Sequence, residues 1–327
     1  MSYGAGEFIA NTSTVVNGEA GPFVPELWSN EILATYKSNL VLAALVTEMD
    51  HVGKKGDTVH IPTPDRSAAN AKAQETKVTT NVINSNLTDV LIDKHFEYST
   101  LVEDFADLQA LGSMRKFLTD DAGYALARQV DWDIHLLGRG TPSATYAPGA
   151  TVAGSEYTDA VIGGDGSTAW DETANTNAGN ASALTDAGIR AMIQTLDDSD
   201  TPLSGRAFVV PPVEKNSLLG ISRFTEQAFT GEVAGGNSIR NGLIGDLYGN
   251  PFYVSTNCAV VDDAGSTADQ RAGLYLHKDA WVLIMQQRMR AQAQYLQQYL
   301  STLFTSDMVY GVKEVRATGA VPFIVPA

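Results

Sequence analysis

Two segments of alternating apolar and polar residues flank a long polar stretch in the first third of the chain. Residues 57–63 (DTVHIPT) and 87–93 (LTDVLID) have the two-residue period of β-strands. Their apolar side is formed by Val59, Ile61, Leu87 and Leu91. The residues between the strands are almost wholly polar, and an isolated two-stranded ribbon buries too little apolar surface to be stable in water. We therefore expect this ribbon to lie on something else, and a partner subunit is the natural candidate.

Helical periodicity begins before the ribbon. Residues 1–21 are rich in Gly, Asn, Ser and Thr and have no period, which predicts an extended or mobile arm. After Pro25 an apolar stripe with a spacing of four residues predicts a helix over residues 25–45. The stripe consists of Trp28, Ile32, Tyr36 and Leu40.

A longer helix is predicted over residues 113–138. Its apolar face carries Met114, Phe117, Leu118, Ala122, Leu126, Val130, Ile134 and Leu137. Its other positions include Arg115, Lys116, Asp120, Arg128 and Asp131. At about 1.5 Å per residue such a helix is roughly 37 Å long, which is enough to span a whole domain. Residues 95–111, which precede it, carry both helix and strand signals, and their type stays open.

The second half of the chain mixes helix and strand signals. Residues 139–182 are dominated by Gly, Ala, Ser, Thr and Asn, which predicts an insertion-like loop region with short strands around Thr151 and Val161. A new unit begins at Thr185, whose hydroxyl can cap a helix with a regular apolar stripe. The elements predicted after it are a strand at 207–210, a helix at 213–221, a Gly-rich loop at 231–242, strands near 252–256, 272–276, 281–285 and 308–315, and a final apolar stretch at 321–325. Residues 292–303 fit either a helix or a strand.

Composition then bounds the class of protein. The chain has 327 residues, of which 44% are hydrophobic and 18% charged, which is enough for a folded core. Its formal net charge of -16 disfavours a nucleic-acid-binding surface, because phosphate recognition needs clustered Lys and Arg. The longest apolar run, residues 40–46, is far shorter than the roughly 20 residues that span a bilayer. No secretory signal is visible, and the single Cys258 excludes an intrachain disulfide. We expect a protein made in the cytoplasm and not inserted in a membrane.

Candidate chemical groups are few. None of the five histidines stands in a metal-ligand spacing with a second His or Cys. Asp131 and His135 are four residues apart on the long helix, and we interpret them as a surface pair that supports the helix. Cys258 and His277 form the only conceivable thiol nucleophile pair, and a small buried apolar cysteine is the favoured interpretation. We therefore expect no catalytic, cofactor-binding or metal-binding residues, and no enzyme activity.

Five segments carry a resemblance to a known family. They are FVPELWSNEILATYKSNLVLAALV (23–46), GDTVHIP (56–62), LIGDLYGNPFYVST (243–256), GLYLHKDAWVLIMQQRMRAQAQY (273–295) and DMVYGVKEVRATGAVPFIV (307–325). Together with the order of the predicted elements, they resemble the major capsid proteins of tailed bacteriophages with the HK97 fold, and among them the branch of short-tailed, T7-like phages. The resemblance covers nearly the whole chain except residues 139–182.

The resemblance implies an α+β, HK97-like capsid fold. Its parts would be an N-terminal arm with a helix (1–53), an extended loop or E-loop (54–95), a peripheral domain (96–183) with a spine helix (113–138) and an insertion (139–182), an axial domain (184–280), and return strands of the peripheral domain (281–327). The implied function is a subunit that self-assembles as hexamers and pentamers into the icosahedral head enclosing phage double-stranded DNA. The protein would be made in the host cytoplasm and reside in the virion.

The resemblance also implies partners and leaves alternatives. No long charged helical extension precedes the fold, so a separate scaffolding protein is implied, together with a portal protein, non-specifically packaged DNA and room for a decoration protein. The alternatives are the shell protein of an encapsulin-type nanocompartment and, from another class, a soluble hydrolase. The candidate site residues are the basic residues of the ribbon, which we expect to contact acidic groups of a neighbouring subunit: Lys54, Lys55, Arg66, Lys72 and Lys77.

Overall fold

The structure of the protein is a computed structural model. It describes residues 40–64, 67, 69–81, 85–104, 114–140, 144–157, 161–162, 170, 181–221, 246–262 and 270–326. The predicted arm, residues 25–39 of the first predicted helix and the Gly-rich loop at 231–242 lie outside these ranges. The end of that helix is α1 (Leu42–Leu45), and the strand β1 (Thr47–Asp50) follows it.

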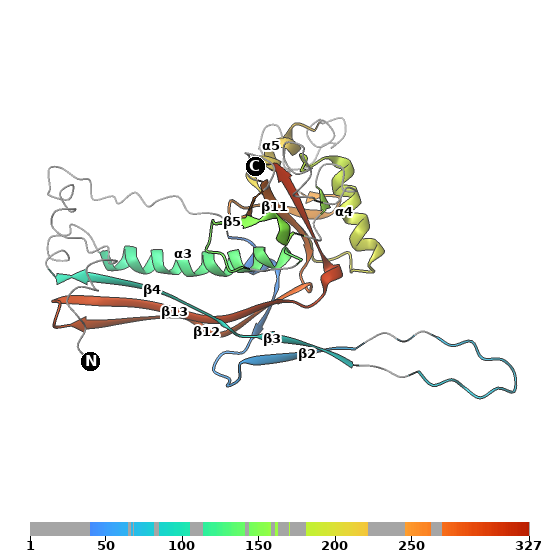
Figure 1. Ribbon diagram of the computed structural model, residues 1–327, viewed down its shortest axis with the longest axis horizontal. Coiled ribbons are helices and arrows are strands. Elements are labelled where there is room, and N and C mark those ends of the chain that lie inside the picture. The colour runs from blue at the N-terminus through green and yellow to red at the C-terminus, as the bar shows by residue number, and fades with distance from the viewer. Residues whose placement is uncertain are drawn as a thin grey trace, which may run out of the picture.

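The described strands form a four-stranded sheet, an eight-stranded sheet and a separate two-stranded ribbon. The four-stranded sheet has the order β1-β12-β13-β4. Its long strands are β12 (Trp281–Leu296), β13 (Ser301–Glu314) and β4 (Lys94–Glu103). β1 runs parallel to β12, and the other neighbouring strands are antiparallel. The three long strands run together toward one end of the molecule (Figure 1).

The long strands decide the type of residues 95–103 and of residues 292–303, whereas residues 105–111 of the first open segment lie outside the described residues. Lys94–Glu103 is a strand that pairs with β13 along its whole length. Residues 292–303 are strand except for a turn at 297–300, where Leu300 has a φ of 44°. The strands predicted at 281–285 and 308–315 are confirmed, and both are longer than predicted. Their polar outer halves are held by cross-strand hydrogen bonds, which an apolar period does not detect.

The predicted long helix is confirmed as α3 (Met114–His135), which the 3-10 turn η2 (Leu136–Gly138) continues. It lies along one face of the four-stranded sheet (Figure 1). Four residues of the predicted apolar face are at most 5% exposed: Ala122, Leu126, Val130 and Ile134. The last two turns are buried on every side, because α1, both sheets and the turn after β9 surround them.

The interpretation of Asp131 and His135 as a surface pair was wrong. Asp131 is 0% exposed and His135 is 2% exposed. The carboxylate of Asp131 accepts hydrogen bonds from the backbone N–H of Leu42 at 2.8 Å and from the side-chain amide of Asn257 at 2.9 Å. A buried charge is tolerated only where such donors meet it, and both donors come from distant parts of the chain.

The eight-stranded sheet has the order β5-β10-β11-β7-β9-β8, with β14 paired to β11 and β6 paired to β14. Its strands are β5 (Thr151–Ala153), β6 (Val161–Ile162), β7 (Arg206–Val210), β8 (Asp246–Leu247), β9 (Asn250–Val254), β10 (Val260–Asp262), β11 (Gln270–His277) and β14 (Ala320–Pro326). The strands predicted around Thr151 and Val161 are confirmed. Both are strands of this sheet, because β5 pairs with β10 and β6 pairs with β14. The region 139–182 therefore contributes strands to the sheet. The 3-10 turns η3 (Gly154–Glu156) and η4 (Ala317–Gly319) lie beside it.

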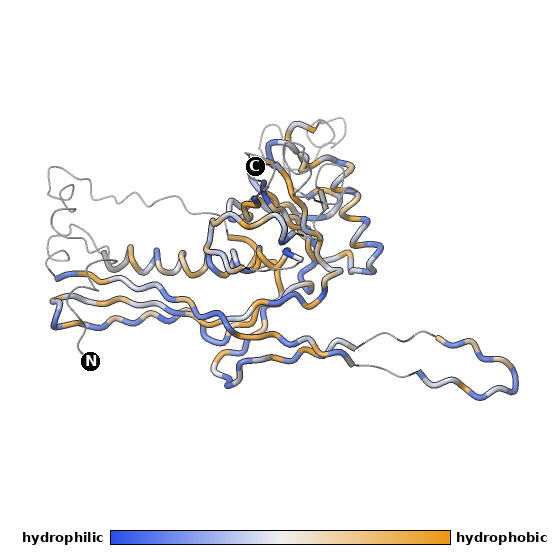
Figure 2. Tube along the Cα trace, viewed as in Figure 1, coloured by the Kyte–Doolittle hydropathy of each residue, from blue (hydrophilic) through white to orange (hydrophobic). Residues whose placement is uncertain are grey.

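Two helices accompany this sheet. α4 (Asp186–Asp198) begins as predicted, with the Thr185 hydroxyl accepting a hydrogen bond from the N–H of Gly188 at 3.2 Å. Its apolar stripe packs against strands β7, β11 and β14 through Ile189, Met192 and Leu196. α5 (Pro212–Leu219) follows the fully buried β7. Apolar residues gather in this body, whereas the end of the ribbon is mostly hydrophilic (Figure 2).

The predicted division into peripheral and axial domains stays a prediction. Of the last three strands, β12 and β13 lie in the four-stranded sheet, whereas β14 pairs with β11 in the eight-stranded sheet. The two sheets share an apolar core beneath the end of α3, where Leu274 of β11 and Trp281 of β12 belong to the same cluster.

Candidate assembly surfaces

The ribbon consists of β2 (Thr58–Pro64) and β3 (Ser85–Leu91), which confirms both predicted strands. The two strands are antiparallel, with Thr58 opposite Leu91 and Pro64 opposite Ser85. The ribbon projects from the body, and its tip lies at the end of the molecule opposite to the outer ends of β12 and β13 (Figure 1). We call residues 69–81 the ribbon tip. We call residues 51–61 and 90–92, which include the part packed on β12, the ribbon root.

The ribbon root packs one face on its own subunit. That face forms an apolar cluster with β12, which contains Val59, Ile61, Val90, Ile92, Val282 and Ile284. The predicted apolar side was wrong for Leu87 and Leu91, whose side chains are 64% and 50% exposed. In the antiparallel register Val59 stands opposite Val90, so these leucines fall on the other face of the ribbon. Alternation along each strand was visible in the sequence, but the register between the strands was not.

The ribbon root crosses β13 at a glycine. A Cβ on Gly311 would lie 2.4 Å from the carbonyl oxygen of Leu91 and 3.1 Å from Cα of Ile92. Only glycine lets the two backbones approach so closely. On the other side, the side-chain amide of Gln286 donates to the carbonyl oxygens of Lys54 at 3.2 Å and Gly56 at 2.8 Å. The root is therefore fixed to both strands of the long hairpin.

The ribbon tip is exposed at every residue. The candidate residues Lys54, Lys55, Lys72 and Lys77 are all exposed, whereas Arg66 lies outside the described residues. The structure does not bring these lysines together into one cluster: the first pair is at the root and the second at the tip. Val78 is an exposed apolar residue of the tip, at 63%.

The outer face of the ribbon carries the two exposed leucines with a histidine–aspartate pair between them. Leu87 stands opposite Pro62, Leu91 stands opposite Thr58, and His60 contacts Asp89 through its Nδ1 atom. Both members of that pair are more than half exposed. Surfaces that mix exposed leucines with polar groups are typical of contacts between proteins. This face was not predicted from the sequence, because the leucines were expected on the packed side.

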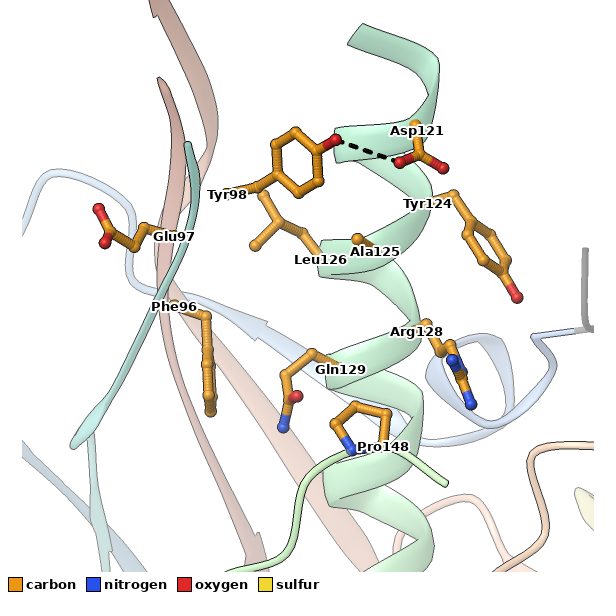
Figure 3. Close-up of a pocket in the computed structure, with 10 residues that line it drawn as sticks. All are labelled: Phe96, Glu97, Tyr98, Asp121, Tyr124, Ala125, Leu126, Arg128, Gln129 and Pro148. Atoms are coloured by element: carbon orange, nitrogen blue, oxygen red, sulfur yellow. Dashed lines mark hydrogen bonds between the residues drawn. The ribbon is translucent and has the colours of Figure 1, made fainter. Parts of the chain in front are cut away.

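A second surface lies across α3 and β4. An open groove of about 440 Å³ is lined by aromatic, aliphatic and charged residues, among them Phe96 and Tyr98 of β4 and Asp121, Tyr124 and Arg128 of α3. Tyr98 and Asp121 point toward each other, and the Tyr98 hydroxyl donates to the carboxylate at 3.2 Å (Figure 3). This groove was not predicted from the sequence, because residues 96–98 carry both helix and strand signals.

The buried end of α3 shifts the pKa of a histidine. Burial lowers the pKa of His135 from 6.5 to about 4, and the nearby Asp131 carboxylate partly opposes that shift. The ring is therefore neutral at pH 7. Its Nε2 atom lies 3.8 Å from Asp131 and has no hydrogen bond within the described residues. The carboxylate of Asp133, by contrast, accepts a hydrogen bond from the Tyr310 hydroxyl at 2.6 Å and lies 3.3 Å from the Lys94 amine.

The other candidate groups have structural partners. Burial raises the pKa of the Cys258 thiol to about 12, and its side chain is part of the apolar core. His277 has its Nε2 atom 2.9 Å from the carbonyl oxygen of Ser204. Among the residues that the structure describes, no group of three His, Cys, Asp or Glu side chains could hold a metal ion. Within the same residues, no helix is both long enough and apolar enough to cross a membrane.

Comparisons with known proteins match this fold to phage structures. No family model and no curated protein matches the chain. A structure from Mycobacterium phage Che8 is similar with 26% identity and a TM-score of 0.67, covering 92% of this chain and 97% of that chain. The capsid of cyanophage P-SCSP1u is similar with 17% identity and a TM-score of 0.69, covering 92% and 93%. The capsid of Ralstonia phage GP4 is similar with 18% identity and a TM-score of 0.64, covering 96% and 98%.

These likenesses confirm the predicted α+β, HK97-like capsid fold. They extend over nearly the full length of both partners in each comparison.

Proposed function

We propose that this chain is the major capsid protein of a tailed bacteriophage, and that it self-assembles as hexamers and pentamers into the icosahedral head that encloses double-stranded DNA. The observation that supports this best is that its likeness to capsid chains covers 92% or more of its length. The protein is then a structural component of the virion.

The surfaces of the subunit support assembly with copies of itself. The ribbon buries one face of its root on its own subunit and leaves its tip and its outer face exposed. A shell is built from many identical contacts, each modest alone and strong in sum. A projecting ribbon supplies such a contact without needing a core of its own.

The finer assignment is also part of the proposal. Residues 54–95 act as the E-loop, α3 as the spine helix, residues 184–280 as the axial domain, and residues 96–183 with 281–327 as the peripheral domain. The five segments that resemble T7-like proteins support placement in the short-tailed branch. Electron microscopy of the phage tests that placement, because a long tail would contradict it.

The partners follow from this role. They are a separate scaffolding protein, a portal protein, packaged DNA held without sequence preference, and a decoration protein where the head carries one. The subunit acts without catalysis. The burial of Cys258 and the backbone contact of His277 support this, because neither side chain is available as a nucleophile or base.

Co-expression with the scaffolding protein tests the main proposal. We expect closed shells in negative-stain micrographs and a large particle in gel filtration. A monomer that forms neither shells nor capsomers under these conditions contradicts the proposal. Shells that hold enzyme cargo in place of DNA in the native host contradict the phage role and favour a nanocompartment.

Charge reversal tests the role of the basic ribbon residues. Arg66→Glu combined with Lys72→Glu should impair assembly without unfolding the subunit, because Lys72 is exposed and an exposed charge contributes little to folding. Lys278→Glu, at an exposed lysine away from the ribbon, is the control. Normal shells from the double variant would refute a role for these charges.

A further inference from the structure

The long hairpin contains an irregularity beside the ribbon root. Met285 of β12 stands opposite Tyr310 of β13, and Arg290 stands opposite Asp307. Between these two pairs β12 advances five residues while β13 advances three, so β12 holds two extra residues. Extra residues of this kind form β-bulges, which bend a strand and increase its twist. We call residues 286–290 the double bulge.

Side chains of the double bulge reach four different elements. Gln286 binds the carbonyl oxygens of Lys54 and Gly56 at the ribbon root. Arg288 lies 3.5 Å from Glu48 of β1. The methyl carbon of Met289 would lie 3.7 Å from a Cβ placed on Gly123 of α3. Arg290 binds Asp307 of β13 through two nitrogens, at 3.1 and 2.8 Å.

Asp307 holds the double bulge at its outer end. Besides Arg290, its carboxylate accepts a hydrogen bond from the Gln287 side chain at 2.8 Å and lies 3.5 Å from the His95 ring. Hydrogen bonds from Arg290 hold the pKa of Asp307 below its ordinary value. The carboxylate therefore stays ionised at neutral pH and ties two bulged residues to β13. Bidentate pairs of this kind fix geometry as well as adding stability.

We propose that the double bulge is a pivot that couples the angle of the ribbon to the spine helix, and that Asp307 is the latch that holds the pivot in one setting. The ladders on either side of the bulge are regular and stiff, whereas within the bulge only Gln287 and Arg290 pair with β13, and the register shifts on both sides of Gln287. Motion is therefore concentrated at the bulge. Gln286 is hydrogen-bonded to the ribbon root, so a change in the backbone conformation of the bulge rotates the ribbon. Met289 packs against α3, so the same change alters the packing of the helix.

The biological role inferred for the pivot rests on the proposed function. A subunit that serves in both hexamers and pentamers meets its neighbours at different angles, and a pivot at the ribbon root lets one sequence fit both. The latch itself is a property of the single chain. It is therefore testable without any shell.

Amide hydrogen exchange on the purified full-length chain tests the latch. The reporters are amides of the ribbon root. The N–H of Ile92 donates to Asp57 within the root, that of His51 donates to Met285 just before the double bulge, and that of Gly53 donates to Gln286 of the double bulge. Asp307→Asn keeps the shape of the side chain and removes its charge. We expect exchange at these amides to become at least about tenfold faster, because charge-assisted hydrogen bonds are lost. Gln286→Ala should produce the same effect at the root while leaving the outer hairpin unchanged.

Glu97→Gln is the matched control. Glu97 stands directly opposite Asp307 on β4 and is exposed, so this variant removes one negative charge at the same place without touching the latch. Arg290→Gln breaks the latch from its other side and serves if Asp307→Asn does not fold. Root exchange at the wild-type rate in both latch variants overturns the inference, and so does equal acceleration in Glu97→Gln. A failure of this kind leaves shell formation, and with it the proposed function, unaffected.

Discussion

The ribbon tip is exposed to solvent and the end of α3 is buried. The polarity of their residues does not predict this difference. Residues 131–135 of α3 are all buried, although they include two aspartates and a histidine. Residues 69–81 of the tip are all exposed, although they include Val78 and several alanines. Burial is decided by what surrounds a segment. The end of α3 lies between two sheets, whereas no described part of the chain covers the ribbon tip. The helix therefore stabilises the subunit, and the ribbon is available to a partner.

The largest effect on the free energy of unfolding is expected from a leucine substitution on the helix. Leu126 is 3% exposed within the main apolar cluster, so Leu126→Ala should lower the free energy of unfolding by about 2–5 kcal/mol, from lost burial and the cavity left behind. Alanine is a good helix former, so the loss is one of packing and not of helix propensity. Urea denaturation of the purified subunit measures it. A loss of under about 1 kcal/mol would mean that α3 is not the stabilising region.

Acidification should destabilise the helix region through His135. Its pKa is lowered from 6.5 to about 4 in the folded protein. Between these values the unfolded chain binds a proton that the folded chain does not, so stability is full above pH 6.5 and falls as the pH drops toward 4. The loss is on the order of 3 kcal/mol. Unfolding measured from pH 7 to pH 4 should show a shallower dependence in His135→Gln. Identical slopes in the two proteins would contradict a buried neutral ring.

The attachment of the ribbon to the body of the subunit is tested at Gly311. Gly311→Ala places a Cβ 2.4 Å from the carbonyl oxygen of Leu91, so the ribbon root must shift. We expect a loss of about 1–3 kcal/mol, which is typical of overpacking. Gly123→Ala is the control, because its Cβ would meet Met289 at an ordinary 3.7 Å and should slightly stabilise the helix. Thermal melts compare the two. A Gly311→Ala protein as stable as the wild type would show that the root is loosely held.

The smallest expected change in folding is on the ribbon itself. Leu87→Ala and Leu91→Ala remove the same atoms as Leu126→Ala, but from side chains that are 64% and 50% exposed. We expect each to change the free energy of unfolding by under about 0.5 kcal/mol, as for surface substitutions in general. Shell yield with the scaffolding protein should nevertheless fall in the double variant. Normal shells would show that the outer face of the ribbon is not an assembly surface.

The sequence alone determined the elements whose signals are local. Periodicity of apolar residues located α3, β7 and both ribbon strands, and the hydroxyl of Thr185 marked the start of α4. These signals act over a few neighbouring residues, where backbone geometry fixes which side chains share a face. The same information, joined to the family resemblance, was enough for the fold class.

Only the tertiary structure decided which faces are covered. Asp131 is buried by donors that lie 89 and 126 residues away in sequence. Leu87 is exposed because the register with β2 turns it outward, and the double bulge exists only as a mismatch between β12 and β13. Each of these depends on pairing between distant segments, and the period of one strand or helix carries no information about its partner's register. The sequence therefore determined what each segment is, and the packing of distant segments decided which of its side chains remain available to another subunit.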